Sequence, residues 1–236
     1  MPNDSHPSRS AVLNMHMSEF WSGDLGLTLT TISLAVLIFV ITPLREAGLP
    51  GRFLFDLIMV TLMISGSLAV NQTRIATAFI VAIVLVSTAV LVMGRLHPTP
   101  FLHQVGSILS TITLLLYVRI VLLVMFRKGL VTWSRIQGGV CAYLLLGMAW
   151  ASAYQFVEQR YPGSIQFISQ PADIDQLTSK LTYFSFGILT SLGSDIAPVL
   201  PFARSLAISE AIVGQLFPAL LIGTLVAMAM QARPKS

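Results

Sequence analysis

Long apolar segments alternate with short polar ones along most of the chain, and this pattern is typical of transmembrane helices. Six segments cover ~27 Å or more as helices at ~1.5 Å per residue, which is enough to cross the hydrocarbon core. They are residues 25–44, 53–70, 75–93, 105–126, 140–157 and 203–230. The sequence therefore predicts an all-α membrane protein with six spans.

One stretch between the last two predicted spans has a different character. Residues 181–198 are too short and too polar to cross a membrane. A run of helical character ends at Thr190-Ser191, a small-residue turn follows at 193–195, and Pro198 and Pro201 prevent the helix from continuing. Extended backbone at membrane depth is tolerated where it lines a water-filled path. This re-entrant stretch therefore indicates a pore.

Composition agrees with the membrane class. Hydrophobic residues make up 55% of the chain and charged residues only 10%, whereas soluble domains carry about 25% charged residues. The mean hydropathy is +0.80. The 14 Lys and Arg residues are scattered through short loops and form no basic stripe, so we expect a partner in membrane lipid and none in nucleic acid.

Residues that could carry enzyme chemistry are sparse. The single cysteine, Cys141, lies in an apolar segment and is expected to be a small buried hydrophobe. The four histidines lack the spacing of metal ligands, and no Ser/His/Asp grouping is visible. We therefore expect no enzyme activity, no metal site and no cofactor.

An even number of spans puts both ends of the chain on the same side of the membrane. The count of Lys and Arg on the two sides, seven against six, does not decide the orientation. The densest cluster, Arg127-Lys128 with Arg135, favours a cytoplasmic linker between the fourth and fifth spans. Both termini are then predicted to be cytoplasmic, in an integral protein of the plasma or inner membrane.

Three blocks of sequence carry a family resemblance. They are Tyr183-Phe-Ser-Phe186, Leu189-Thr-Ser-Leu-Gly-Ser-Asp-Ile196 with Pro198, and the stretch from Ala203-Arg-Ser-Leu-Ala through Glu210-Ala to Gly214-Gln-Leu216. Residues 183–223 resemble the pore domain of the potassium-channel superfamily, which often reads Y-F-S-F-x-T-L-T-T-V-G-Y-G-D-I-T-P and then A-R-S-L-A-x-x-E-A-x-x-G-Q-L. The resemblance implies a homotetramer with permeating monovalent cations, potassium and possibly sodium.

The resemblance also implies a domain organisation. A cytoplasmic tail at 1–24 would precede a four-helix transmembrane domain at 25–128. The pore domain at 129–230 would contain an outer helix, a pore helix at 178–190, the selectivity filter and an inner helix. A short tail at 231–236 would follow, so we expect no soluble ligand-binding domain in the chain.

The centre of the resemblance departs from the family pattern. Where the family has T-V-G-Y-G-D, this chain has Ser191-Leu-Gly-Ser-Asp195, which is one residue shorter and lacks the second glycine and the aromatic residue. Potassium selectivity depends on rings of backbone carbonyls, and glycine permits the backbone angles that aim them inward. We therefore expect strict potassium selectivity to be weakened or absent. Four copies of Asp195 could form a carboxylate ring.

Residue roles follow from the matched positions. The ion-pathway filter comprises Thr190, Ser191, Leu192, Gly193, Ser194 and Asp195. Glu210 is expected to face protein or water near the pore helix, because a carboxyl group in lipid is costly. Gly214 and Pro218 are candidate hinge and kink points of the inner helix, with close helix packing as an equal alternative for Gly214.

The first four spans lack the charge pattern of a voltage sensor. Such a sensor needs several arginines at every third position of its fourth span, but that span here contains Arg119 alone, with Arg127 and Lys128 at its end. Asp56 is the other charge inside this region. We interpret Asp56 and Arg119 as a static ion pair across the four-helix domain in preference to a moving sensor.

Two classes of function remain open. The first is a tetrameric pore-loop cation channel of the potassium-channel superfamily, for potassium or for cations without selection. The second is a non-conducting regulatory or sensory membrane protein built on a channel scaffold, which the shortened filter keeps open. A secondary transporter ranks last, because such proteins contain inverted repeats and paired broken helices, and this chain has a single re-entrant stretch and no internal repeat.

The proposed pairing of Asp56 with Arg119 can be tested by neutralisation. Asp56→Asn or Arg119→Gln alone should lower the thermal unfolding temperature in detergent more than the double variant does, because each single change leaves one intramembrane charge without its partner. Equal losses from the single and double variants would count against the pair.

Overall fold

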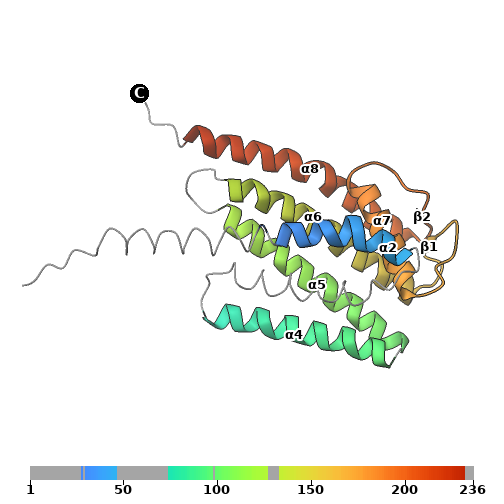
Figure 1. Cartoon of the computed structure of the whole chain (residues 1–236). Coiled ribbons are helices and arrows are strands. Elements are labelled where there is room, and N and C mark those ends of the chain that lie inside the picture. The colour runs from blue at the N-terminus through green and yellow to red at the C-terminus, as the bar shows by residue number, and fades with distance from the viewer. Residues whose placement is uncertain (1–27, 29, 47–73, 98, 127–132, 232–236) are drawn as a thin grey trace, which may run out of the picture.

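In the computed structural model the chain is mostly helical, and the structure describes residues 28, 30–46, 74–97, 99–126 and 133–231 (Figure 1). A first helix spans residues 30–46 and includes the π-helical turn η1 (Leu37–Ile41) and α2 (Thr42–Glu46). The remaining elements are α4 (Arg74–Leu96), α5 (Pro100–Met125), α6 (Trp133–Arg160), β1 (Ile165–Gln166), α7 (Ile174–Leu189), β2 (Ala197–Pro198) and α8 (Pro201–Gln231). The shorter α7 and the two strands lie together at one end of the long helices (Figure 1).

Within the described part of the chain, three helices are long and apolar enough to cross a membrane. They are Pro100–Leu123 of α5, Arg135–Arg160 of α6 and Pro201–Met228 of α8, with mean hydropathies of 2.0, 1.4 and 2.0. Helices α6 and α8 contain the predicted spans 140–157 and 203–230, and α5 contains most of 105–126, but each helix begins earlier than its predicted span. Proline opens both α5 and α8, because its missing N–H is unpaired in a first turn anyway. The predicted span 53–70 lies outside the described residues.

The π turn in the first helix has a local cause. Pro43 has no N–H to donate to the carbonyl of Phe39, so the regular helical ladder is interrupted there. Over η1 the backbone hydrogen bonds span five residues instead of four. Both the N–H and the hydroxyl of Thr42 donate to the carbonyl of Leu37, the hydroxyl at 2.9 Å. The rare π-helical segments of proteins occur mostly as single turns of this kind inside α-helices. The helix therefore continues past its proline.

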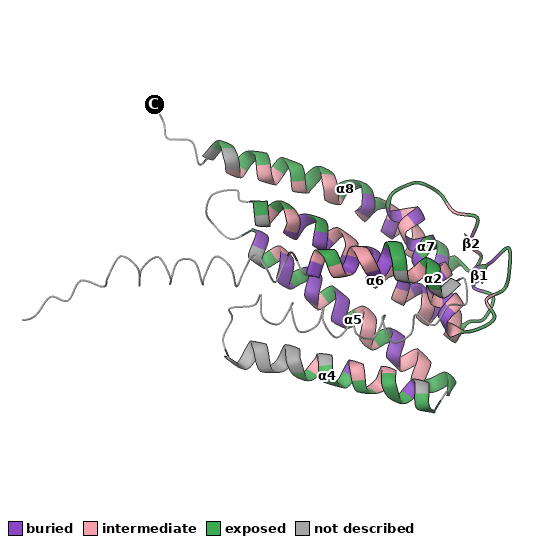
Figure 2. Cartoon of the chain, in the orientation of Figure 1, coloured by how far each residue is buried: buried purple, intermediate pink, exposed green. Residues whose placement is uncertain are grey.

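One apolar core joins the first helix to α5 and α6. Its fully buried members include Leu34 and Leu37 from the first helix and Cys141 from α6, so the cysteine has the structural role expected of it. The other buried members are Ile38, Leu114, Tyr117, Val118, Val121, Ala142, Leu145, Met148 and Ala149. Helix α4 joins α5 through a buried hydrogen bond between the hydroxyls of Ser87 and Thr113, 2.9 Å apart. Figure 2 shows these buried faces along α5 and α6.

A second apolar cluster fixes α7 between α6 and the strands. It consists of Tyr154, Ile165, Phe167, Leu177, Leu181, Phe184 and Ile196. The rings of Tyr154 and Phe184 meet edge to face, with centroids 4.9 Å apart and an interplanar angle of 64°, a favoured aromatic arrangement. Three consecutive turns of α7 contribute a side chain each, and this periodicity seats the helix.

Glu158 organises the loop that follows α6. Its carboxylate accepts hydrogen bonds from the N–H of Gly163 at 2.8 Å, the hydroxyl of Ser164 at 2.8 Å and the N–H of Ile165 at 2.9 Å. This loop then pairs with the chain after the re-entrant turn, since β1 and β2 are antiparallel with Ile165 opposite Pro198. The sequence analysis did not predict this sheet, because strands of two residues show no periodicity.

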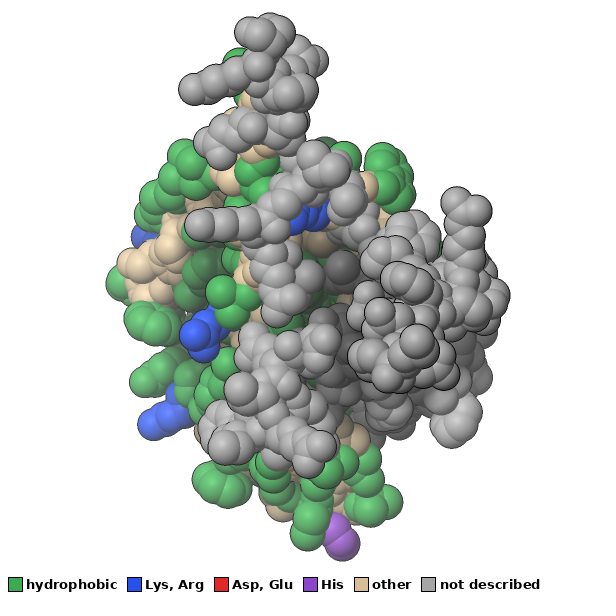
Figure 3. Space-filling model, turned by 90° about the vertical axis from the view of Figure 1, so that its left-hand side faces the viewer, with side chains coloured by type: hydrophobic (Ala, Val, Ile, Leu, Met, Phe, Trp, Pro, Cys, Tyr) green, Lys and Arg blue, Asp and Glu red, His purple; other side chains and the backbone are tan. Residues whose placement is uncertain are grey.

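Figure 3 views the molecule from the end opposite α7, and most of the side chains that it draws in colour are hydrophobic. Arg135 lies in the first turn of α6 at this end and contacts the sulfur of Met228 near the end of α8, at 4.0 Å from a guanidinium nitrogen. The two long helices therefore begin and end at the same level.

Asp173 should contribute measurably to the stability of α7. Its carboxylate accepts a hydrogen bond from the N–H of Gln176 at 2.8 Å and caps the helix. Asp173→Ala should lower the free energy of unfolding by about 1 kcal/mol, because the first turn loses this acceptor. Asp173→Asn keeps a capping oxygen and should retain most of the stability. Equal thermal unfolding of both variants in detergent would refute the cap.

Candidate functional site

The site is built around the C-terminal end of α7, where helical carbonyls have no partner within the helix. The carbonyl of Leu189 accepts a hydrogen bond from the hydroxyl of Tyr143 on α6 at 3.0 Å. From the other side it packs directly on Gly214 of α8, where a Cβ atom would overlap the carbonyl oxygen. The rings of Tyr143 and Phe217 stack with centroids 5.8 Å apart. One carbonyl group is therefore held between α6 and α8.

The chain reverses immediately after this point. Thr190 caps α7, with its N–H 3.0 Å and its hydroxyl 2.6 Å from the carbonyl of Phe186. Ser191 has φ +57° and Gly193 has φ +86°. A left-handed conformation is natural for glycine and uncommon for serine. Two of the residues that the sequence analysis assigned to the filter, Ser191 and Gly193, are therefore in the left-handed region.

The returning chain lies against α7 itself. The N–H of Gly193 donates to the carbonyl of Gly187 at 3.1 Å. A Cβ atom at Gly187 would lie 2.6 Å from the carbonyl oxygen of Gly193. Residue 187 therefore has to be glycine for the turn to close onto the helix at this distance.

The filter residues lie mostly on an exposed face of the single chain. Thr190, Ser191, Leu192, Gly193 and Asp195 are exposed, and Ser194 is half-buried. Leu192 is 79% exposed. The side-chain amide of Gln215 on α8 donates to the hydroxyl of Ser191 at 2.6 Å, which ties the turn to the long helix. This face combines a polar turn with the helix that follows it.

The structure places Glu210 behind α7, fully buried. Its carboxyl group lies 2.5 Å from the hydroxyl of Ser185 on α7 and accepts a hydrogen bond from the hydroxyl of Tyr154 on α6 at 2.6 Å. Glu210 itself belongs to α8. A single carboxyl group thus connects the three helices that surround the turn.

Gly214 and Pro218 lie one turn apart on α8. The close approach of the Leu189 carbonyl gives Gly214 a packing role in this structure. Pro218 lies inside the helix and removes the N–H that would bond the carbonyl of Gly214. Helix α8 nevertheless continues without interruption from Pro201 to Gln231.

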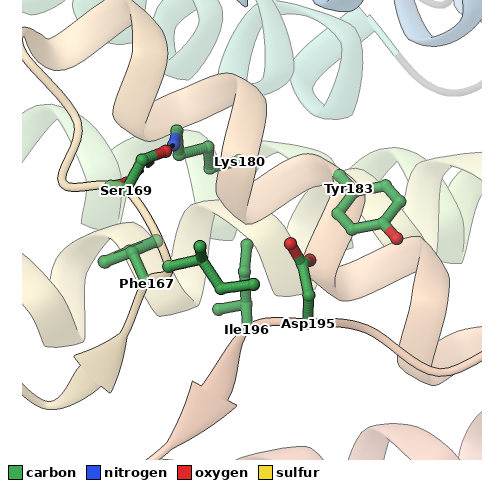
Figure 4. Close-up of a pocket in the computed structure, with 7 residues that line it drawn as sticks. Phe167, Ser169, Lys180, Tyr183, Asp195 and Ile196 are labelled. Carbon is green, nitrogen blue, oxygen red and sulfur yellow. Dashed lines mark hydrogen bonds between the residues drawn. The ribbon is translucent and has the colours of Figure 1, made fainter.

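Asp195 borders a surface hollow of about 330 Å³ between α7 and the turn. Figure 4 shows Asp195 and Ile196 on the returning chain, with Lys180 and Tyr183 projecting from α7 and Phe167 and Ser169 from the loop after β1. The ammonium group of Lys180 donates to the carbonyl and hydroxyl oxygens of Ser169, at 2.7 and 2.5 Å. Lys180 is therefore committed to the loop, and the carboxylate of Asp195 stays at the exposed surface.

Of the predicted charge pair, the structure describes one residue, Arg119. Arg119 is exposed on α5, and Asp56 lies outside the described residues. The pairing stays a prediction. No group of three His, Cys, Asp or Glu residues that could hold a metal ion occurs within the described ranges.

Several residues that build the site were missed by sequence reasoning. Tyr143, Tyr154 and Ser185 each place a hydroxyl within an apolar helix, and Gly147 and Gly187 allow close approach. The hydroxyls could have been flagged as partners for Glu210, because polar groups inside membrane helices generally pair with one another. Only the folded chain shows which hydroxyl meets which acceptor.

Comparisons with known proteins add no family to this picture. No family model, no curated protein and no solved structure matches the chain. The resemblance to a potassium-channel pore is thus carried by the motifs alone.

The contact at Gly214 predicts different outcomes for two glycines of the same helix. Gly214→Ala should destabilise the protein by about 1–3 kcal/mol, because the added methyl group collides with the backbone of Leu189. Gly223→Ala is the matched control, since a Cβ atom there meets open space and alanine favours the helix. Similar unfolding temperatures for the two variants in detergent would show that α8 does not press on the end of α7.

Proposed function

We propose that this chain is the subunit of a tetrameric pore-loop cation channel of the potassium-channel superfamily. In this reading α6 is the outer helix, α7 the pore helix, residues 190–195 the filter and α8 the inner helix, and the pore domain follows a four-span domain. Three helices long and apolar enough for a membrane support the membrane setting.

The main support for the proposal is the way in which α7 ends between α6 and α8. A helix of 16 residues, too short to span a bilayer, ends between two helices of spanning length. Its last carbonyl, at Leu189, is bound by Tyr143 and packed on Gly214. The negative end of a helix dipole favours a nearby cation. A turn with two left-handed residues then follows.

The exposed surface of α8 supports a tetrameric assembly. In its membrane-spanning window only 6% of the residues are buried, against 44% for α5 and 50% for α6, and Figure 2 shows α8 exposed along most of its length. One re-entrant turn cannot enclose a path. Four copies of α8, each carrying Gln215 beside its Ser191, would surround a central pore lined by four turns.

We assign the orientation from the basic residues around the start of α6. The positive-inside rule assigns Lys- and Arg-rich short loops to the cytoplasm. Arg127 and Lys128 precede α6 in the sequence, and Arg135 lies in its first turn. We therefore assign this end to the cytoplasm and the turn with α7 to the opposite side.

Weak selection among cations follows from the short turn. The segment Ser191–Asp195 is one residue shorter than the family pattern and lacks its second glycine, so it supplies fewer backbone carbonyls to a path than a longer filter would. Four exposed Asp195 carboxylates would attract cations to the mouth without choosing between potassium and sodium.

The alternative is a non-conducting membrane protein on the same scaffold. Leu192, 79% exposed at the tip of the turn, favours it, because four such side chains would form an apolar constriction. Hydrophobic constrictions exclude ions by dewetting. A regulatory or sensory role would then use the scaffold without ion flow.

Ion flux from liposomes tests the proposal directly. Purified protein should pass potassium and sodium at comparable rates and should have the mass of a tetramer in mild detergent. Asp195→Asn should lower cation flux several-fold at low ionic strength, because the carboxylate ring concentrates cations at the mouth. No flux of any cation from tetrameric protein would favour the non-conducting alternative, and strict potassium preference would refute the argument from the short filter.

A further inference from the structure

The polar cluster behind α7 contains three fully buried side chains, one from each surrounding helix. Tyr154 on α6, Ser185 on α7 and Glu210 on α8 all have 0% exposed surface. Tyr154 donates to one carboxyl oxygen of Glu210 at 2.6 Å, and the hydroxyl of Ser185 lies 2.5 Å from the other. The same hydroxyl lies 2.8 Å from the carbonyl oxygen of Gly147 on α6. Ser185 therefore contacts two oxygen atoms, each at hydrogen-bond distance.

Counting hydrogens distinguishes the two protonation states of Glu210. A serine hydroxyl carries one hydrogen and can donate once. If Glu210 is ionised, Ser185 donates to it, and the contact with the carbonyl of Gly147 places two lone pairs together with no hydrogen between them. If Glu210 carries a proton, it donates to Ser185, and Ser185 donates to Gly147. Only the protonated carboxyl group satisfies all three contacts.

We propose that Glu210 holds a proton and acts as the positioning residue that fixes the pore helix α7 between α6 and α8. The carboxyl group donates to Ser185, Ser185 donates to Gly147, and Tyr154 donates to the second carboxyl oxygen. The relay stabilises α7 four residues before Leu189, the carbonyl at the start of the turn. Its effect on conduction rests on the proposed function, whereas the protonation itself does not.

The surroundings of Glu210 agree with an uncharged group. Within the described residues no Lys, Arg or His forms an ion pair with it. The groups facing it are hydroxyls, with Tyr154 and Tyr143 from α6 and Ser185 from α7. The basic side chains nearest to it along α7 and α8 are engaged elsewhere: Lys180 with Ser169, and Arg204, whose Nε donates to the carbonyl of Pro198 at 3.2 Å. A buried carboxylate without a countercharge is strongly destabilising.

Ionisation of Glu210 would undo the relay. Ser185 would turn its only hydrogen towards the carboxylate, and α7 would lose its hydrogen bond to Gly147. The end of α7 and the turn that follows would then keep their contacts with Tyr143, Gly214 and Gln215 but lose this attachment to the outer helix. A single proton thus decides how firmly the pore helix is attached to the outer helix.

Glu158 on α6 provides a matched control, because the same counting gives the opposite answer. Its three partners are the N–H groups of Gly163 and Ile165 and the hydroxyl of Ser164, all donors to its carboxylate oxygens. An ionised carboxylate accepts all three bonds, so no proton is required. Glu158 and Glu210 therefore differ in the protonation state that their hydrogen-bond partners require.

Infrared spectroscopy of the full-length protein separates the two states, because a protonated carboxyl group absorbs apart from carboxylates. The wild type should show a protonated-carboxyl band at neutral pH that is absent from Glu210→Gln and unchanged in Glu158→Gln. A band that persists in Glu210→Gln, or a Glu210→Gln spectrum that loses only carboxylate intensity, would overturn the proposal. This readout needs no ion flux, so it stands whether or not the protein conducts.

The positioning role is tested by flux and by tetramer mass together. Ser185→Ala breaks the relay and should lower cation flux about tenfold or more, because a buried donor loses its acceptor. Glu210→Gln keeps an uncharged donor and acceptor and should retain most of the flux that Ser185→Ala loses. Wild-type flux in tetrameric Ser185→Ala would refute the positioning role. A wild type that carries the infrared band but passes no cation would refute only the proposed function.

Discussion

The structure depends on how the last carbonyl of a short helix is satisfied inside an apolar setting. An unpaired backbone carbonyl is costly wherever water is scarce. The carbonyl of Leu189 is bound by Tyr143 and covered by Gly214, and this constraint fixes α7 against both α6 and α8. The position of α7 in turn fixes the position of the turn that follows, because the N–H of Gly193 donates a hydrogen bond to the carbonyl of Gly187. The candidate filter is therefore a consequence of how a helix ends.

Small residues allow the helices to approach closely, and side-chain hydroxyls form hydrogen bonds between them. Gly147, Gly187 and Gly214 each stand where a Cβ atom would collide with a neighbouring ring or backbone. Ser185, Tyr143 and Tyr154 supply the hydrogen bonds at the same level of the molecule. This combination is typical of helix packing in membranes, where apolar burial between helices gives little driving force.

The first helix is part of the same structure. Leu34 and Leu37 lie in the core shared with α5 and α6. The hydroxyl of Ser179 on α7 donates to the carbonyl of Thr42 at 2.9 Å, just after the π turn that Pro43 makes necessary. The first helix is therefore attached to α7 by a hydrogen bond as well as to α5 and α6 by the apolar core.

The sequence by itself determined the helical class, the three helices of the described part that are long and apolar enough to span a membrane, and the end of α7 near Thr190. These depend on periodicity, proline and glycine, which act locally along the chain. It did not determine the earlier start of α7 at Ile174 or the pairing of β1 with β2, because a cap and a two-residue strand leave little pattern. The partners of Glu210 were decided only by the tertiary structure, since Tyr154 and Ser185 lie 56 and 25 residues away. Sequence spacing carries no information on which hydroxyl on another helix faces a buried carboxyl group.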